Sequence, residues 1–295
     1  MTASGGEPHA DGLLADAVRA ADAAARSAGV TIREVDDVAG HTAIDQLWTA
    51  VWGGSAMSAE LLRALAKAHN YVAAAYVGDR MVGACAGFFH APAERALHSH
   101  VAGVSGEAAG RGVGFALKLH QRAWVLERGL DAITWTYDPL IARNAHFNLT
   151  KLRARAIEYL PNFYGAMPDA INRGDESDRV LVRWDLRDPD VVAACSGSRQ
   201  ARPAGTARPA VQARPARDEA GLVTVPVPGD IEALRTTDPA AARRWRTAVR
   251  EGLLPALSGG CAVVGFGRDG YLVRPAPTGA PAPDPSTAPT TEETA

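Results

Sequence analysis

The chain has 295 residues, of which 47% are apolar and 22% are charged, and its formal net charge at pH 7 is −2. This composition is typical of a globular protein with a sizeable core, and the charge balance excludes a wholly basic nucleic-acid binder. No uncharged apolar run approaches the roughly 18 residues of a membrane span, so we expect no membrane partner. The chain does not start with the basic-then-apolar pattern of a secretory signal, which predicts a cytoplasmic protein.

The three cysteines, Cys85, Cys195 and Cys261, are far apart in the sequence. They form neither a Cys-x-x-Cys metal pair nor the framework of a disulfide-rich protein. The sequence therefore predicts no metal site.

The predicted elements follow one another as a mixture of short strands and helices. Residues 1–28 are rich in alanine and acids, and we expect a flexible N-terminal extension with at most a loose helix. Apolar periodicity and turn residues then predict the following order. Strands are expected at 31–35, 71–78, 81–90, 97–104, 131–137, 156–160 and 179–186, and helices at 41–52, 58–69, 113–128 and 144–155. This order predicts an α/β domain at 29–188 with a mixed, mainly antiparallel sheet flanked by helices.

The composition changes after residue 188. Residues 189–221 contain the repeated phrase Ala-Arg-Pro-Ala and are predicted to be a disordered Arg/Pro/Ala linker. A helix starting at Asp238-Pro239 and a hairpin through Arg268-Asp269-Gly270 predict a C-terminal helix-hairpin appendage at 222–274. The Pro- and Thr-rich residues 275–295 are predicted to be a disordered tail.

The segment that follows the strand at 97–104 is rich in glycine and opens the helix at 113–128. Gly110, Gly112 and Gly114 allow tight bends and close approach of the backbone to a ligand. The first amides of the helix lack internal partners and lie at the positive end of its dipole, which favours a phosphate or pyrophosphate. A dinucleotide site is disfavoured, because Leu117 stands where the third glycine of G-x-G-x-x-G is required.

The stretch Val104-Ser105-Gly106-Glu107-Ala108-Ala109-Gly110-Arg111-Gly112-Val113-Gly114 resembles the acyl-CoA loop of the GCN5-related N-acetyltransferase (GNAT) superfamily. The helix and strand that follow it, and the order of strands from Ile32 to Leu186, are similar to a bacterial branch of that superfamily. The resemblance implies a splayed GNAT-like sheet and an acyltransferase that moves an acetyl or other short acyl group from acyl-CoA to an amine of a small molecule or amino acid.

The same resemblance implies which residues hold acetyl-CoA or another acyl-CoA. Backbone groups of Val101, Ala102, Gly103 and Val104 would bind the pantetheine amides. The pyrophosphate would lie on Gly110, Arg111, Gly112, Val113 and Gly114. Independently of the resemblance, Asn144 and Asn148 are four positions apart and share one helix face, where they could bind CoA or the substrate, although capping is an equal alternative for Asn144.

Two positions differ from the family pattern. Ala109 stands where the family usually has arginine or glutamine, and Leu149 stands where it usually has the tyrosine that protonates the leaving thiolate. Tyr164, in the turn Asn162-Phe163-Tyr164-Gly165, is the candidate replacement, because a phenol can donate to a thiolate. His100 is the candidate base, and Asp138, after the strand at 131–137, is a candidate to hold the acceptor.

The sequence is compatible with three alternatives. The arginines in residues 199–217 would suit a nucleic-acid or carrier-protein partner, so the donor could be an aminoacyl-tRNA or an acyl carrier protein. Ala109 and Leu149 also suit a non-catalytic acyl-CoA-binding sensor. A homodimer is compatible with the appendage, which would complete either a pocket or a dimer interface.

Overall fold

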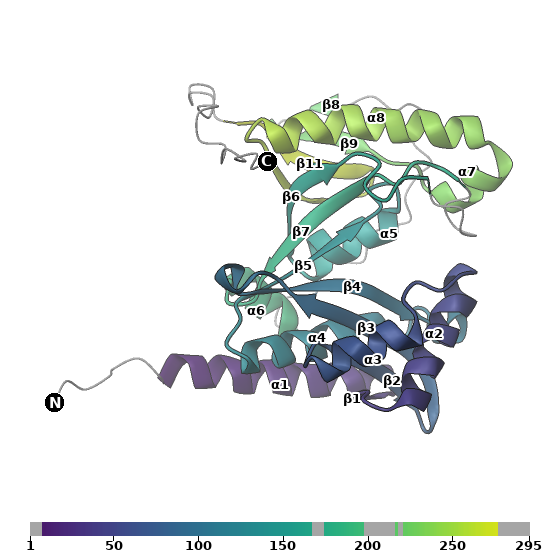
Figure 1. Ribbon diagram of the computed structural model, residues 1–295. Coiled ribbons are helices and arrows are strands. Elements are labelled where there is room, and N and C mark those ends of the chain that lie inside the picture. Colours follow the sequence, from purple (N-terminus) through teal and green to yellow (C-terminus); the bar gives the residue numbers. More distant parts are fainter. Residues whose placement is uncertain (1–7, 167–173, 198–215, 218–220, 277–295) are drawn as a thin grey trace, which may run out of the picture.

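The computed structural model describes residues 8–166, 174–197, 216–217 and 221–276 (Figure 1). The helices are α1 Pro8–Ala28, α2 Val38–Trp52, α3 Ala59–Lys67, α4 Val113–Glu127, α5 Ala142–Ala145, α6 Pro189–Cys195, α7 Ile231–Thr237 and α8 Pro239–Ser258. Short 3₁₀ turns η1 and η2 cover Pro92–Glu94 and Gly106–Ala108, and a π-helical segment, η3, covers His146–Lys151. No helix in these ranges is long and apolar enough to cross a membrane.

The strands form two sheets. They are β1 Thr31–Glu34, β2 Val72–Val77, β3 Arg80–Phe89, β4 Ala96–Val104, β5 Ala132–Tyr137, β6 Arg155–Leu160, β7 Arg179–Asp185, β8 Ala216–Arg217, β9 Val223–Pro226, β10 Ala262–Phe266 and β11 Gly270–Arg274. The main sheet has the order β1-β2-β3-β4-β5-β7-β6. Within the described chain every neighbouring pair in it is antiparallel except β4 and β5, which are parallel. The predicted fold class, a mixed and mainly antiparallel sheet flanked by helices, is confirmed.

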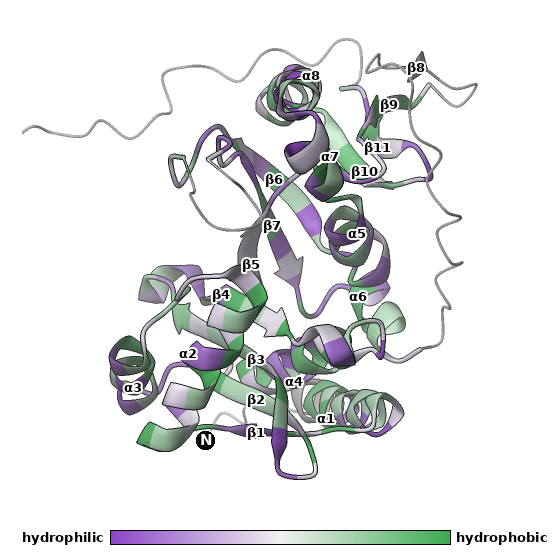
Figure 2. Ribbon diagram, turned by 90° about the vertical axis from the view of Figure 1, so that its right-hand side faces the viewer, coloured by the Kyte–Doolittle hydropathy of each residue, from purple (hydrophilic) through white to green (hydrophobic). Residues whose placement is uncertain are grey.

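The two faces of the main sheet carry different layers. Helices α1 and α4 pack against each other on one face, while α2 and α3 cover the β1–β4 half of the other (Figure 1). The central strands are apolar on both faces, as the green ribbon of β2 and β3 shows (Figure 2). This pattern is expected where helices cover both sides of a strand. Ser58 is the N-cap of helix α3, and its hydroxyl accepts a hydrogen bond from the Leu61 amide.

The N-terminal region differs from the flexible extension that the sequence predicts for residues 1–28. Residues 8–28 are one long helix rather than a loose extension, and Ala17 and Ala21 are almost fully buried. The buried positions of α1 are alanines, whose small side chains let α1 approach α4 closely. Because alanine is only weakly apolar, the sequence shows little hydrophobic periodicity there.

The region after the main sheet differs in part from the disordered linker that the sequence predicts for residues 189–221. Within the range 189–221, α6 is an ordered helix that Asp188 caps, with Val191 and Cys195 buried against the core. Ala216 and Arg217 form the short strand β8. The remainder of the predicted linker, and residues 277–295 of the predicted tail, lie outside the described residues.

The C-terminal appendage contains the predicted helix and hairpin and a second sheet of order β10-β11-β9-β8. It packs on the β5–β7–β6 end of the main sheet (Figure 1). Polar contacts fix it there: the Tyr271 hydroxyl donates to the Pro139 carbonyl at 2.8 Å, and the Thr150 hydroxyl donates to the Phe266 carbonyl at 3.1 Å. The appendage and the half of the chain that contains the main sheet share one hydrophobic core.

Candidate active site

Strands β4 and β5 separate soon after they meet. They pair only through Ala96 with Ala132, Leu97 with Ile133 and His98 with Thr134, although β4 runs on to Val104 and β5 to Tyr137. The backbone of β4 from Ser99 onward is therefore unpaired on its β5 side. Buried backbone groups need partners, so this V-shaped opening can accept a ligand that carries amides of its own.

An ion-pair clamp closes the narrow end of the V. The carboxylate of Asp131, just before β5, accepts from Arg95 Nε at 2.9 Å and from Arg187 Nε at 2.7 Å. Its backbone adds two bonds, because its amide donates to the Arg95 carbonyl and its carbonyl accepts from the Leu186 amide. β4 and β5 are thus held together at one end only, whereas β5 and β7 stay paired along the whole of β5.

A β-bulge lies on β4 where the opening begins. Ala86 pairs with Val101, but Gly87 pairs with Ser99, so His100 is the extra residue on β4. Gly87 is required there, since a Cβ would stand 2.6 Å from the His98 carbonyl oxygen. Bulges re-aim side chains and are frequent beside active sites, and this one directs His100 to an exposed position.

Three histidines gather on the face of the sheet that α2 and α3 partly cover. The ring of His98 lies 5.9 Å from those of His90 and His100, and Phe88 packs against His98 and His100. Burial, and then the neighbouring histidines, lowers the pKa of His98 to about 4. His98 is therefore neutral near pH 7 and a weak base. His100 is more exposed, and partial burial lowers its pKa to a smaller degree.

The glycine-rich loop presents free amides at the start of α4. Gly112 is the N-cap residue with φ 87°, and the first intrahelical bond runs from the Ala116 amide to its carbonyl. The amides of Val113, Gly114 and Phe115 therefore have no acceptor within the helix. Ala109 to Gly112 are exposed, and the Ser105 hydroxyl beneath the loop is buried without a partner among the described residues. These features fit a pyrophosphate.

Arg111 lies at the edge of this loop. Its guanidinium reaches the turn after α1, where Nη2 stands 3.4 Å from the position of a Cβ on Gly29. Its side chain is exposed, so it remains available to an anion at the loop.

Tyr164 lies on the same face as the histidines, on the β5 side of the opening. Its hydroxyl is 3.3 Å from the Thr136 hydroxyl, two residues along β5 from the Thr134 that contacts His98 and His90. Two strand residues span about 6.6 Å. The structure thus brings Tyr164 and the histidines to opposite sides of one opening, and Leu149, at the family's tyrosine position, is buried in the core.

Asp138 is placed differently from the prediction. Its side chain is 5% exposed, and its Oδ2 accepts from Arg235 at 2.5 Å and from Arg246 at 3.3 Å. Its Oδ1 accepts from the Leu140 amide, and despite burial the two arginines keep its pKa below the ordinary value. This carboxylate is an ion-pair partner of the appendage and has no free oxygen for an acceptor.

The two asparagines have separate surroundings. Asn148 is buried, and its Oδ1 accepts from Trp135 Nε1 at 3.1 Å, so it holds a core tryptophan. Asn144 is half-buried at the surface of α5. The helical stretch that carries both ends as the π-helical η3, a form that is often found at functional sites.

Lys118 is the residue that sequence reasoning missed. It is 5% exposed on α4, and its Nζ donates to Ser99 Oγ at 2.8 Å and lies 3.9 Å above the Trp135 ring. Ser99 and Trp135 follow the last β4–β5 pair, so the ammonium lies beneath the start of the opening. Burial lowers its pKa to about 8. A signal existed in the sequence: Lys67, Lys118 and Lys151 are the only lysines among 31 basic residues.

Neither a family profile nor a curated protein sequence matches this chain. Among solved structures, the chain is similar to a putative GNAT-family acetyltransferase from Desulfovibrio desulfuricans, with 17% identity and a TM-score of 0.42 over 53% of this chain and 99% of that one. It is also similar to yncA, a putative acetyltransferase from Salmonella typhimurium with its cofactor acetyl-CoA, with 15% identity and a TM-score of 0.45 over 54% and 95%.

A third similar structure is an aminoglycoside 6′-N-acetyltransferase complexed with coenzyme A, with 16% identity and a TM-score of 0.42 over 54% of this chain and 98% of that one. All three align with about half of this chain.

Proposed function

We propose that the protein is an acyl-CoA-dependent N-acyltransferase whose acceptor is the amine of a small molecule. One observation carries the proposal: β4 and β5 separate after His98 and Thr134, and the unpaired edge of β4 leads to the glycine-rich start of α4. An unpaired strand edge binds amides and a helix start binds phosphates. A molecule that carries both, in that order, matches the pantetheine and pyrophosphate of CoA.

The residues have separable roles. Backbone groups of Val101 to Val104 bind the pantetheine amides, and Val113 and Gly114 hold the pyrophosphate with their amides. Bound acyl-CoA supplies an activated thioester. Nucleophilic attack needs a neutral amine, and His100, on the exposed bulge, accepts the proton directly or through a water.

Tyr164 is the proton donor in this proposal. Its phenol lies opposite His100 across the opening, and the turn that carries it is fixed in place: the Tyr164 amide donates to Ser177 Oγ at 2.8 Å and the Asn162 amide donates to Asp178 Oδ1 at 2.9 Å. A fixed backbone with an exposed hydroxyl suits a group that must reach a leaving atom.

The test has two stages on the full chain. Calorimetric titration with acetyl-CoA and CoA measures donor binding, and mass spectrometry of an amine panel incubated with acetyl-CoA measures transfer. Saturable binding with acetylated product supports the enzyme. Absence of CoA binding would overturn the donor assignment.

A CoA-binding sensor is the second candidate, and the burial of Leu149 favours it, since no phenol occupies that helix position. Saturable CoA binding without product from any amine, in both the native chain and a Leu149→Tyr variant, would support the sensor over the enzyme.

A further inference from the structure

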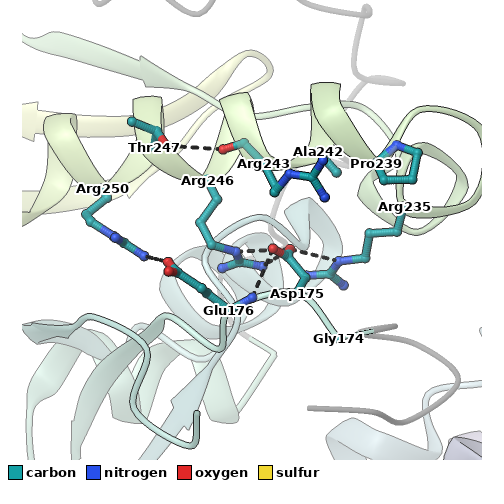
Figure 3. Close-up of a pocket in the computed structure, with 10 residues that line it drawn as sticks. All are labelled: Gly174, Asp175, Glu176, Arg235, Pro239, Ala242, Arg243, Arg246, Thr247 and Arg250. Atoms are coloured by element: carbon teal, nitrogen blue, oxygen red, sulfur yellow. Dashed lines mark hydrogen bonds and ion pairs between the residues drawn. The ribbon is translucent and has the colours of Figure 1, made fainter. Parts of the chain in front are cut away.

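A separate cavity of about 300 Å³ lies between α8 and the segment 174–176, outside the opening between β4 and β5 (Figure 3). Its charged lining consists of Arg235, Arg243, Arg246 and Arg250 with Asp175 and Glu176. No residue of the glycine-rich loop or of the histidine face contributes to it.

Helical spacing creates this lining. Residues 243, 246 and 250 are separated by three and four positions, so they project from one face of α8. Figure 3 shows Arg246 and Arg250 reaching from the helix to Asp175 and Glu176, with Arg243 beside them. Arg235 comes from α7 and completes the group.

Most of these guanidinium groups have carboxylate partners. Arg246 contacts Asp175 at 2.9 Å, and Arg250 contacts Asp178 at 2.6 Å as well as Glu176. Arg243 differs, because it forms no ion pair with any residue in the described part of the chain. Its side chain is exposed at the cavity, and its five N–H donors bond no side chain or carbonyl of the described residues, so they are open to water or to an anion.

Arg246 also has an unused donor. Its side chain is 3% exposed, its Nε and Nη2 contact Asp175, and Nη2 also contacts Asp138. Its Nη1 is buried and finds no acceptor among the described residues. A buried charged donor left without an acceptor is costly, and Arg246 lines the cavity, so an acceptor that reached Nη1 would bind favourably.

We propose that this cavity binds the oxyanion group of a small metabolite, either a phosphate or a carboxylate, between Arg243 and Arg246. Asp138 and Asp178 lie outside the lining but pair with Arg235, Arg246 and Arg250, so four carboxylates balance the four arginines, and Arg243 is the one of these arginines that contacts none of the four carboxylates. Guanidinium groups match both oxyanions through paired N–H donors. The volume is at the low end for ligand sites, which fits a small metabolite rather than a nucleotide.

The chain offers a matched pair of variants for the test. Arg243→Gln removes the unpaired guanidinium without breaking an ion pair, so the fold should be kept. Arg244→Gln is the control: Arg244 is the next residue, 70% exposed, and it faces Asp238 at 3.7 Å outside this cavity. Arg243→Lys keeps the charge but loses the forked donor geometry.

The experiment measures binding of inorganic phosphate and of succinate to the full chain by equilibrium dialysis, at constant ionic strength balanced with sodium chloride. We expect saturable binding of one probe with a Kd of roughly 1 mM or tighter. Arg243→Gln should weaken it at least tenfold, Arg243→Lys should weaken it less, and Arg244→Gln should leave it unchanged.

The two probes separate the sources of the oxyanion. Binding of phosphate alone indicates a phosphate ester, and binding of succinate alone indicates a carboxylate. Absence of saturable binding of either probe, or equal loss in the Arg243→Gln and Arg244→Gln variants, overturns the proposal. Circular dichroism and the unfolding temperature of each variant show that a loss of binding is not a loss of fold.

Discussion

His98 and Thr134 are the last pair between β4 and β5, and their side chains also meet, with 3.2 Å between His98 Nδ1 and Thr134 Oγ1. The same hydroxyl lies 2.8 Å from His90 Nε2. One hydroxyl can donate to only one of the two imidazoles, so the other must donate to it. The start of the opening is therefore fixed by a side-chain network as well as by the backbone.

This network predicts a specific pH dependence of stability. The pKa of His98 is about 4 in the folded protein and 6.5 in the ordinary state. As the pH falls from 6.5 to about 4, the unfolded chain binds a proton that the folded chain refuses, so the free energy of unfolding falls. In His98→Gln that decrease should be smaller. Urea unfolding across this range measures it, with exposed His69→Gln as the control. Equal slopes in all three proteins would contradict the prediction.

Gly114→Glu should weaken CoA binding without loss of fold. Gly114 has an ordinary φ, and a Cβ there meets only Val104 at 3.9 Å. A carboxylate in the first turn of α4 is favourable for the helix but occupies the amides that hold an anion. The affinity for CoA should fall at least tenfold, or about 1.4 kcal/mol, by calorimetric titration. Gly114→Ala, which adds bulk without charge, should bind almost as the native chain does. CoA binding by Gly114→Glu at native strength would refute the loop assignment.

Tyr164→Phe tests the proton donor. The side chain is 44% exposed and its hydroxyl contacts Thr136, so the fold and CoA affinity should be unchanged. If the phenol donates a proton in the transition state, kcat should fall roughly 10²-fold and the basic limb of the pH–rate profile should change. Thr136→Val is the matched control, since it removes the partner of the hydroxyl and keeps the phenol. A rise in KM alone would instead indicate that Tyr164 orients the acceptor.

Asp138→Asn should be a stability variant rather than a catalytic one. Removing this charge takes away a buried ion-pair partner of Arg235 and Arg246. The loss should lower the free energy of unfolding by about 3–5 kcal/mol. Asp185→Asn is the control, because Asp185 pairs with Arg155 and Arg183 near the surface and should cost about 1 kcal/mol or less. A stable Asp138→Asn protein with a greatly reduced kcat would restore the catalytic assignment.

Lys118→Met should alter stability in a pH-dependent way. The lysine has a folded pKa of about 8 against 10.5 ordinarily, so its burial penalty is fully present below pH 8 and is relieved as the pH rises toward 10.5. Between the two pKa values, the free energy of unfolding should rise by about 3 kcal/mol. Between pH 7 and pH 9.5, the native chain should gain stability relative to Lys118→Met. Lys67→Met, at an exposed site, should follow the native chain.

The sequence predicts the main sheet well because local pattern dominates there. Strands β2 to β5 have apolar runs bounded by turns, and Gly112 stands at a position with φ 87°, which favours glycine. The loop and its free amides follow from a local arrangement of glycine and a helix start. Both could therefore be placed without knowledge of tertiary contacts.

Other features depend on partners distant in the chain. The position of Asp138 after β5 was predicted correctly, but Arg235 and Arg246, about 100 residues later, decide what it does. The burial of the alanines in α1 depends on the surface of α4. Hydrophobic periodicity in the sequence alone therefore does not reveal that α1 is a packed helix. Lys118 is recognisable only by its rarity, because its burial comes from the contacts of Ser99 and Trp135.

The clamp at Asp131 makes the opening between β4 and β5 blind at one end. An extended ligand that enters from the glycine-rich loop would lie along β4 from Val104 to Ser99. This stretch of strand is about 17 Å long at the rise of a β-strand. The ligand then meets the closed pair at His98 and Thr134 and can go no deeper. Under the proposed function, this closed end limits how far the acyl-pantetheine chain can enter, and a longer acyl group would have to bend toward the histidine face.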